Sequence, residues 1–448
     1  MNSTETGSAA ARRVPGQSVW QRELPADPDG LSERAVAQLE RYSGSALARL
    51  LRFMGMTTLE WEAHGAVVRD CHGQEYVECG GYGLFVHGHS HPLVVEAVRR
   101  QAATLAQSTR LLPHLQQAEL SAALADVCPG ELRYSFFCNS GAEAVEGALK
   151  LARAHTGRQG ILAAQDAFHG KTMGALSASG KAMYRDPFLP LVPGFAHVPY
   201  GDAEALEAEA RGIASEPGGL GAILLEPIQG EAGVVVPPPG YLALARRLCD
   251  ELGALLILDE VQTGVGRTGE WFRCQAEGVV PDILATAKSL GGGVMPLGAF
   301  IATPECWQPF DESPFLHTST FGGSPLACAA GLAALRAIRE EGLLERAREL
   351  GRLLGKGLGE IGRRYPGAIS AVRGEGLFWG LDLRSEGVGG LMLSRLLGEG
   401  GVLVVYSLNR PNVIRVMPPA VATPEQIEFV LEAIDTAARE AEALGGEL

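Results

Sequence analysis

The sequence predicts an α/β protein built on a mostly parallel sheet that is covered by helices, with a smaller α+β domain after it. Apolar runs of strand length lie at 134–140, 222–227 and 254–261, and amphipathic segments of helix length separate them. Strands that are apolar throughout are typical of a parallel sheet buried on both faces. At 448 residues the chain is also longer than one ordinary domain, which favours two lobes around a cleft.

The chain opens with a segment that we expect to be disordered. Residues 1–25 are polar and small, with Pro and Gly among them, and offer little apolar surface to bury. Residues 26–91 follow, with an amphipathic helix capped by Ser32 and a hairpin over 65–79 that turns at Asp70–Gly73. We expect this N-terminal region to pack against the small domain.

The alternation of helices and strands begins at about residue 92 and extends through the predicted large domain, 92–335. Its last element is a long helix that starts at Pro325. Residues 336–448 form the predicted small C-terminal domain, because helices there accompany a strand pair around Gly374–Leu383 and a final helix ends near Leu444.

The composition excludes several classes of protein. A net charge of −14 disfavours a nucleic-acid surface, since phosphate binding draws on clusters of Lys and Arg. The eight cysteines are scattered, with no CxxC pair, and indicate neither a disulfide framework nor a zinc site. The first residues hold no apolar core of a signal peptide, and no run of about 18 apolar residues occurs. We therefore expect a cytoplasmic protein without a membrane segment.

The most informative motif places an acid and a lysine at the ends of successive strands. LLILDEVQTG (255–264) carries Asp259, and PDILATAKSLGGG (281–293) carries Lys288, one of five lysines in the chain. A lysine can deprotonate and attack an aldehyde, whereas an arginine stays charged. A carboxylate can keep a pyridine nitrogen protonated, so that the ring withdraws electrons. Together these residues indicate pyridoxal phosphate chemistry, with Lys288 as the Schiff-base lysine and Asp259 as the partner of the ring nitrogen.

Other strand ends carry residues that suit the same cofactor. Ser140, Gly141 and Ala142 join a strand to a helix, where backbone N–H groups can bind a phosphate, although a capped turn explains them equally well. Phe168 in the FHG motif could stack on a flat ring, although a lone aromatic there is more often part of the core. Gln262 would place an amide beside a phenolic oxygen of the cofactor.

Two motifs suggest ligands that we do not expect. GVGRTG (264–269) matches the GxGxxG dinucleotide pattern, but no clear helix start follows it, and Asp282 comes too early to bind a ribose. The HGHSH run (87–91) places three imidazoles at alternate positions, but its glycine and the following proline indicate a turn. Since no carboxylate or cysteine joins these histidines, we expect no metal.

In these motifs and their order the chain resembles the class III, ornithine-type aminotransferases of the type I pyridoxal phosphate fold, over nearly all of its length from about residue 50. Six long motifs carry the resemblance: YSFFCNSGAEAVEGALKLA, FHGKTMGALSASG, EPIQGEAGVVVPPPGYL, LILDEVQTGVGRTG, PDILATAKSLGGGVMPLGAFIA and HTSTFGGSPLACAA. The nearest likeness is to bacterial putrescine aminotransferases, through RFMGMTTL, RYSFFCNS, GGGVMPLGA and FLHTSTFGG. The resemblance implies that the large domain holds the cofactor.

The resemblance also implies a role for each residue that matches a cofactor contact of the family. The residues at the strand-to-helix turn would hold the phosphate, and Phe168 would stack on the ring. Val261 would lie behind the ring, and Glu226 would support the site. Thr320 would reach the phosphate in the neighbouring subunit, so that a homodimer shares its active sites. The implied cofactor contacts are Ser140, Gly141, Ala142, Phe168, Glu226, Asp259, Val261, Gln262, Lys288 and Thr320.

Substrate contacts follow from the same resemblance. Arg415, in NVIRVMPP, would bind the α-carboxylate of glutamate or 2-oxoglutarate, and Glu231 would pair with it when a substrate lacks that group. Tyr82 would line the substrate pocket. Lys171 stands where many members hold a second substrate carboxylate with an arginine, and it carries the charge without the bidentate fork.

We therefore expect an aminotransferase that moves the terminal amino group of a diamine or ω-amine, such as putrescine, to a 2-oxo acid such as 2-oxoglutarate or pyruvate. The unusual YSLN segment (406–409) leaves open a specialised biosynthetic enzyme for another terminal amine or aldehyde. An ornithine- or acetylornithine-type enzyme also remains open. Decarboxylases, racemases and aminomutases of the same fold share the cofactor motifs, and an idle cofactor sensor would also keep Lys288.

Overall fold

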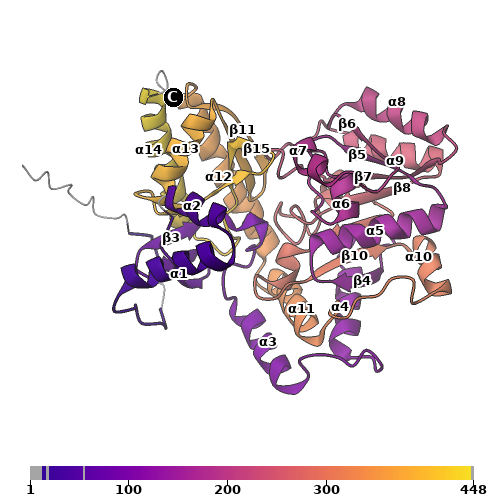
Figure 1. Ribbon diagram of the computed structural model, residues 1–448, viewed down its shortest axis with the longest axis horizontal. Coiled ribbons are helices and arrows are strands. Elements are labelled where there is room, and N and C mark those ends of the chain that lie inside the picture. The colour runs from indigo at the N-terminus through magenta and orange to yellow at the C-terminus, as the bar shows by residue number, and fades with distance from the viewer. Residues whose placement is uncertain (1–12, 17–19, 54–55, 445–448) are drawn as a thin grey trace, which may run out of the picture.

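Figure 1 shows the computed structural model, which describes residues 13–16, 20–53 and 56–444. Its elements form two groups. The N-terminal elements, in indigo, lie beside the C-terminal elements, in yellow, while the magenta and orange elements surround the largest sheet. The two ends of the chain therefore contribute to the same part of the molecule.

The largest sheet in the described part of the chain has seven strands, in the order β4-β10-β9-β8-β7-β5-β6. Strands β6, β5, β7, β8 and β9 pair in parallel, whereas β10 runs antiparallel to both β9 and β4. The predicted α/β class with a mostly parallel sheet is thus confirmed. The strand bounds are β4 Tyr134–Cys138, β5 Gly160–Ala164, β6 Phe195–Val198, β7 Leu220–Leu225, β8 Leu255–Asp259, β9 Ile283–Thr286 and β10 Gly298–Ala302.

Apolar residues cover both faces of this sheet, because its strands are buried between two layers of helices. In β8, Leu256 and Leu258 pack into one core, while Leu255 and Ile257 pack into the other. This alternation explains why the strands are apolar throughout. One layer contains α5 Gly141–Thr156, α6 Met173–Ala178 and α10 Pro304–Glu312. The opposite layer contains α4 Leu115–Ala125, α8 Ala203–Ala214, α9 Tyr241–Leu252 and α11 Pro325–Glu340.

Two smaller sheets lie outside the large one, and the first of them joins strands from both ends of the chain. One has the order β1-β2-β3-β13, and in it β3 pairs in parallel with β13. The other has the order β11-β12-β15-β14 and packs against α12 Leu343–Arg364 and α13 Glu386–Leu397, and α14 Pro424–Leu444 packs against these two helices. The strands are β1 Glu60–His64, β2 Val67–Asp70, β3 Glu75–Glu78, β11 Ile369–Glu375, β12 Phe378–Leu383, β13 Val402–Leu403, β14 Val405–Ser407 and β15 Arg410–Val416. The predicted domain boundaries stay predictions.

The N-terminal elements differ in part from those expected. The predicted hairpin forms, since β2 and β3 pair antiparallel, and the Gly73 N–H donates to the Asp70 carbonyl in its turn. The first helix, α1 Pro28–Tyr42, begins four residues before Ser32, so that the predicted cap is wrong. The cap is Asp27, whose carboxylate accepts the Gly30 N–H, and Pro28 follows it with a φ angle suited to the first turn. Helices α2 Ser45–Phe53 and α3 Pro92–Thr104 complete this region. Much of the predicted disordered segment lies outside the described residues.

The three histidines of the HGHSH run bind three separate partners. His87 Nε2 lies 3.0 Å from the Ala334 carbonyl, His89 pairs with Glu78 at 3.1 Å, and His91 pairs with Glu341 at 3.2 Å. The expectation that no carboxylate joins them is wrong, because the fold brings these acids from distant segments. Within residues 13–16, 20–53 and 56–444, no group of three potential ligands is arranged to hold a metal ion.

Candidate active site

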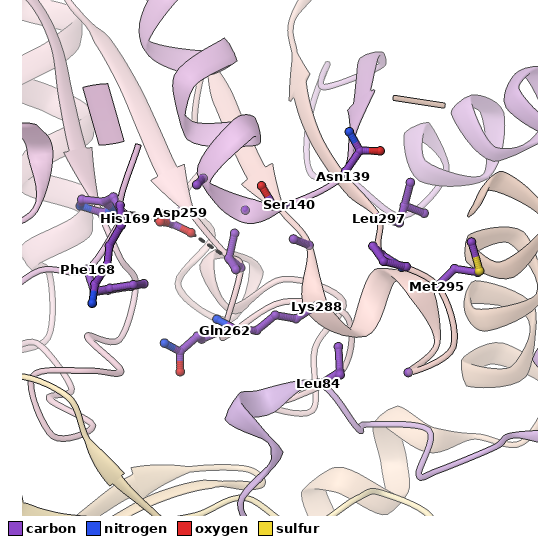
Figure 2. Close-up of a pocket in the computed structure, with 18 of the residues that line it drawn as sticks. Leu84, Asn139, Ser140, Phe168, His169, Asp259, Gln262, Lys288, Met295 and Leu297 are labelled. Carbon is purple, nitrogen blue, oxygen red and sulfur yellow. Dashed lines mark hydrogen bonds and ion pairs between the residues drawn. The ribbon is translucent and has the colours of Figure 1, made fainter. Parts of the chain in front are cut away.

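The predicted catalytic residues lie in loops at the carboxyl ends of parallel strands. Asp259 is the last residue of β8, Glu226 directly follows β7, and Lys288 and Ser140 lie two residues beyond β9 and β4. These strands run in the same direction, so their loops meet at one edge of the sheet. Figure 2 shows Ser140, Phe168, Asp259 and Lys288 around a shared cavity, although they come from different elements.

The cavity at this edge has a volume of about 680 Å³, within the usual range for small-molecule and cofactor pockets. Residues that the sequence had not singled out also line it, among them Leu84, His169 and Met295. The predicted site residues that line it are Ser140, Gly141, Ala142, Phe168, Lys171, Glu226, Asp259, Val261, Gln262 and Lys288. The structure therefore brings together most of the predicted cofactor set.

Asp259 is fixed by two partners inside the cavity wall. It is 5% exposed, its Oδ1 accepts the Val261 N–H at 3.1 Å, and its Oδ2 lies 2.8 Å from Nδ1 of His169. Burial disfavours the charged form of His169, but the hydrogen bond and charge of Asp259 outweigh it and raise the pKa of the imidazole. An acid oriented in this way can pair with a protonated ring nitrogen.

His169 is the functional residue that sequence reasoning missed. It stands in the same FHG motif as Phe168, but only the aromatic residue was considered there. The structure explains its importance, because His169 orients a carboxylate that is 90 residues away in the chain. The signal available in the sequence was a histidine directly after Phe168 in this motif.

Lys288 begins the short helix η4 Lys288–Gly291 in a backbone conformation that is rare for a non-glycine residue. Its φ angle is 49°, in the left-handed region, which directs the residue away from the line of β9. The side chain lines the cavity and keeps part of its surface accessible there. The surrounding protein lowers its pKa to about 8, mainly by burial, and the negative charges of Glu231 and Asp259 oppose this shift. An amine with this pKa is more readily deprotonated than an exposed lysine.

The turn at Ser140–Ala142 forms the N-terminus of α5. The Ser140 hydroxyl accepts the Glu143 N–H at 3.2 Å, so the predicted cap is present. Gly141 leaves no room for a side chain, since a Cβ there would lie 2.9 Å from Val261. Small residues at the N-terminus of a 16-residue helix offer backbone N–H groups and the positive end of the helix dipole to the cavity. This arrangement could hold a phosphate.

Glu226 connects the loop after β7 to the loop after β5. One carboxylate oxygen accepts the Phe168 N–H at 3.0 Å, and the other accepts the Gly230 N–H at 3.1 Å. Burial raises its pKa to about 7; the charge of His169 opposes this shift and that of Asp259 adds to it. Glu226 thus fixes the backbone of the residue expected to stack on a ring.

Arg415 and Glu231 form a buried ion pair beside the cavity. Arg415 is 0% exposed, and its Nη1 lies 2.7 Å from Oε1 of Glu231. Gln262 joins both, since its Nε2 donates to Glu231 at 3.2 Å and its Oε1 accepts from Arg415 at 3.1 Å. The Gln262 amide thus contacts both members of the ion pair, and its contact to a phenolic oxygen of the cofactor stays a prediction. The pair lies 184 residues apart in the chain and forms only through the fold.

Three predicted residues lie outside the cofactor contacts described above. Tyr82, in the short helix η1 Gly81–Gly83, is 60% exposed, and its ring centroid lies 5.7 Å from the Arg415 guanidinium carbon. The Lys171 ammonium lies 4.5 Å from the ring centroid of Tyr184. Thr320 is exposed in the segment between α10 and α11 and is not among the residues that line the cavity.

Comparison with known proteins decides the family. The model of the class III aminotransferases matches residues 55–438, which is most of the chain. The chain belongs to this family. The resemblance seen in the sequence motifs is thereby confirmed at the level of the family, and the protein is an aminotransferase that transfers an amino group from an amine donor to a 2-oxo acid.

Solved structures of other aminotransferases have the same fold. The ornithine aminotransferase of Toxoplasma gondii is 31% identical, with 93% of this chain and 96% of that chain covered and a TM-score of 0.85. An acetylornithine aminotransferase from Elizabethkingia anophelis is 33% identical, with coverage of 91% and 99% and a TM-score of 0.77. A thermostable (S)-enantioselective omega-transaminase from Thermomicrobium roseum is 30% identical, with coverage of 94% and 100% and a TM-score of 0.84.

As a class III aminotransferase, the protein uses pyridoxal phosphate, and its cavity fits that cofactor. The wall offers a buried carboxylate with an imidazole behind it, an amine with a lowered pKa, and a helix N-terminus whose glycine has no space for a Cβ. These groups suit a ring nitrogen, an aldehyde and a phosphate. Among the residues that the structure describes, no helix has the length and apolar character needed to cross a membrane.

Proposed function

We propose that this aminotransferase takes the terminal amino group of a diamine or ω-amine and passes it to a 2-oxo acid such as 2-oxoglutarate or pyruvate. The observation that carries this proposal is the buried pair of Arg415 and Glu231 beside the cavity that holds Lys288. A guanidinium that can be either paired or free suits an enzyme that must accept one substrate without a carboxylate at the reacting carbon and another with one.

When bound, pyridoxal phosphate supplies an aldehyde that takes up the amino group and a ring that withdraws electrons from the adjacent carbon. In our proposal, Ser140, Gly141 and Ala142 hold the phosphate and Phe168 packs on the ring face. Asp259, oriented by His169, holds a proton on the ring nitrogen. Val261 lies against the other ring face, and Glu226 fixes the loop that carries Phe168.

Lys288 has two tasks in this scheme. It first holds the cofactor by its amine and then, once a substrate amine has displaced it, moves a proton from the substrate carbon to the neighbouring carbon of the cofactor. Its lowered pKa increases the fraction of neutral amine, the form that can accept that proton, relative to an exposed lysine at the same pH. Burial, the main cause of the shift, also keeps bulk water from competing for the proton.

Arg415 and Glu231 adapt the site to its two substrates. With an amine that lacks a carboxylate beside the reacting carbon, Glu231 neutralises the buried Arg415, which would otherwise be a costly unpaired charge. With a 2-oxo acid, the substrate carboxylate takes the place of Glu231. The Tyr82 ring lies near the Arg415 guanidinium, and in our proposal it lines the substrate position.

Lys171 supports a second candidate substrate class, the ω-amino acids handled by ornithine-type enzymes. Its ammonium lies over the Tyr184 ring at the cavity wall, and it would repel the distal ammonium of a diamine but attract a distal carboxylate. Ornithine and acetylornithine aminotransferases are among the structural relatives. The putrescine likeness of the motifs favours the diamine, whereas the charge of Lys171 favours the amino acid.

The homodimer is part of the proposal. Thr320 is exposed on one subunit, and its placement outside the cavity fits a role toward the cofactor phosphate of a neighbouring copy. A cytoplasmic location stays a prediction of the sequence. Dilution to the monomer, followed by sedimentation and activity measurements, tests whether the two subunits are needed for function.

A substrate panel tests the reaction itself. Diamines, ω-amino acids and α-amino acids would be offered as donors, each with 2-oxoglutarate and with pyruvate, and Lys288→Ala would give the background. The Lys171→Met variant separates the two substrate classes, since it should favour diamines and weaken ω-amino acids by up to about fivefold, as expected for an exposed charge. Exclusive use of α-amino acid donors would contradict both candidates.

A further inference from the structure

Residues 406–409, which end β14 and form the turn to β15, contact the acid of the buried ion pair directly. The Leu408 N–H donates to Oε2 of Glu231 at 2.8 Å. The Asn409 N–H donates to the backbone carbonyl of the same residue at 3.0 Å. Two successive N–H groups of the turn are therefore bonded to Glu231, which lies 177 residues earlier in the chain.

The turn is itself held by two side chains. The Tyr184 hydroxyl, from helix α7 Ala182–Arg185, donates to the Leu408 carbonyl at 3.1 Å. The Asn409 side chain is 3% exposed, and its Nδ2 donates to the Asp166 carbonyl at 2.7 Å. Lys171 packs its ammonium on the Tyr184 ring, which favours the rotamer that reaches the turn. The Leu408–Asn409 peptide, whose N–H donates to the Glu231 backbone carbonyl, is thus fixed at its carbonyl oxygen as well.

The two oxygens of the Glu231 carboxylate bind different partners. Oε1 accepts from Arg415 at 2.7 Å and from Gln262 at 3.2 Å, whereas Oε2 accepts from Leu408. For Arg415 to bind a substrate carboxylate, Oε1 has to leave while Oε2 is still held by the turn. The rigidity of the turn therefore adds to the free energy needed to release Arg415.

We propose that Tyr184 and Asn409 are positioning residues that fix the 406–409 turn, hold Glu231 against Arg415, and so set how strongly the enzyme favours amines over 2-oxo acids. This inference rests on the proposed roles of Glu231 and Arg415. It accounts for the YSLN segment, which the roles derived from the family motifs leave unused. Burial, and then the negative charge of Glu231, raise the pKa of the Tyr184 phenol, in accord with its position close to that acid.

The Tyr184→Phe variant tests this with the loss of one hydroxyl group. Glutarate, a dicarboxylate without a reactive carbonyl, would be titrated into the holoenzyme by calorimetry. Its affinity should increase about two- to tenfold, the effect of losing one neutral hydrogen bond that favours the closed pair. The amine KM should change less than twofold, because the paired state dominates before and after the change. Tyr365→Phe, which loses a hydroxyl contact to Asp435 far from the site, is the matched control and should leave both values unchanged.

Asn409→Ala should shift glutarate affinity in the same direction, since it removes the bond to Asp166. General damage to the fold would weaken amine and glutarate binding together, in contrast to the expected tightening of one alone. Unchanged or weaker glutarate binding in Tyr184→Phe would overturn the inference. If Arg415→Ala binds glutarate with the same affinity as the wild type, the proposed role of Arg415 fails instead. This outcome distinguishes a failure of the proposed function from a failure of the inference about Tyr184 and Asn409.

Discussion

Replacing Arg415 by alanine removes the centre of the proposed substrate switch. The guanidinium is fully buried and bonds to Glu231 at 2.7 Å, to Gln262 at 3.1 Å and to the Tyr406 carbonyl at 3.1 Å. After Arg415→Ala, Glu231 keeps its bonds from Leu408 and Gln262 but loses its positive partner. The variant therefore leaves a carboxylate buried without a counter-charge.

Two magnitudes follow from this geometry. Breaking a buried ion pair destabilises a protein by about 3–5 kcal/mol, and the donors that remain on Glu231 place the expected loss at the lower end. Truncating one member of a buried charge pair weakens binding by about 2–5 kcal/mol, so the 2-oxo acid half-reaction should slow about 30- to 4000-fold. The amine half-reaction should lose much less, because its substrate makes no contact with the guanidinium.

Single-turnover measurements of the two half-reactions separate these outcomes, and thermal unfolding gives the stability. Glu231→Ala completes the comparison, since it frees Arg415 and should shift the preference toward donors that carry an α-carboxylate. Arg415→Lys keeps the charge without the fork and should recover part of the 2-oxo acid rate. Equal losses in both half-reactions of Arg415→Ala would show that the residue is structural, and the reasoning would be refuted.

Three further predictions concern the cofactor residues. Borohydride treatment of the holoenzyme should fix the cofactor on Lys288, as read by peptide mapping, and Lys288→Ala should lose the label and nearly all transamination; a label on Lys171 or Lys181 would contradict the assignment. Asp259→Asn should still bind the cofactor, as measured by absorbance, but lose about 10²-fold or more in turnover, because a neutral amide cannot hold the ring-nitrogen proton; near-normal turnover would exclude the proposed role. In the cofactor-free protein, the lowered pKa of Lys288 means that burying its charge costs up to about 3 kcal/mol below pH 8, and this cost should vanish as the pH rises through 10.5. Denaturant unfolding of wild type and Lys288→Met across this range checks the sign, since the wild type should gain stability relative to the variant as the pH rises.

Local patterns predicted much of the fold, because short-range physics determines it. Apolar runs such as 255–259 are recognisable as buried strands, and the serine at 140 is recognisable as a helix cap, since strand burial and capping depend on neighbouring residues. The same reasoning misplaced the first helix start at Ser32, because Asp27 and Pro28 offered a better cap four residues earlier. When two residues close in sequence can both cap a helix, the local pattern alone does not show which of them does.

The sequence by itself determined which chemistry the chain supports. A lysine and an acid at successive strand ends, together with the family motifs, were sufficient to indicate the cofactor and the class of reaction. Each motif that carries one of these signals is a short local stretch, so its residue types and their order can be read directly from the sequence.

Only the tertiary structure decided how those groups are tuned and partnered. The imidazole of His169 behind Asp259, the pairing of Arg415 with Glu231, and the bond from Leu408 to Glu231 join segments 90 to 184 residues apart. The lowered pKa of Lys288 likewise arises from burial and from charges that the fold places around it. Long-range contacts depend on how whole layers of helices and strands pack, and no local pattern contains that information.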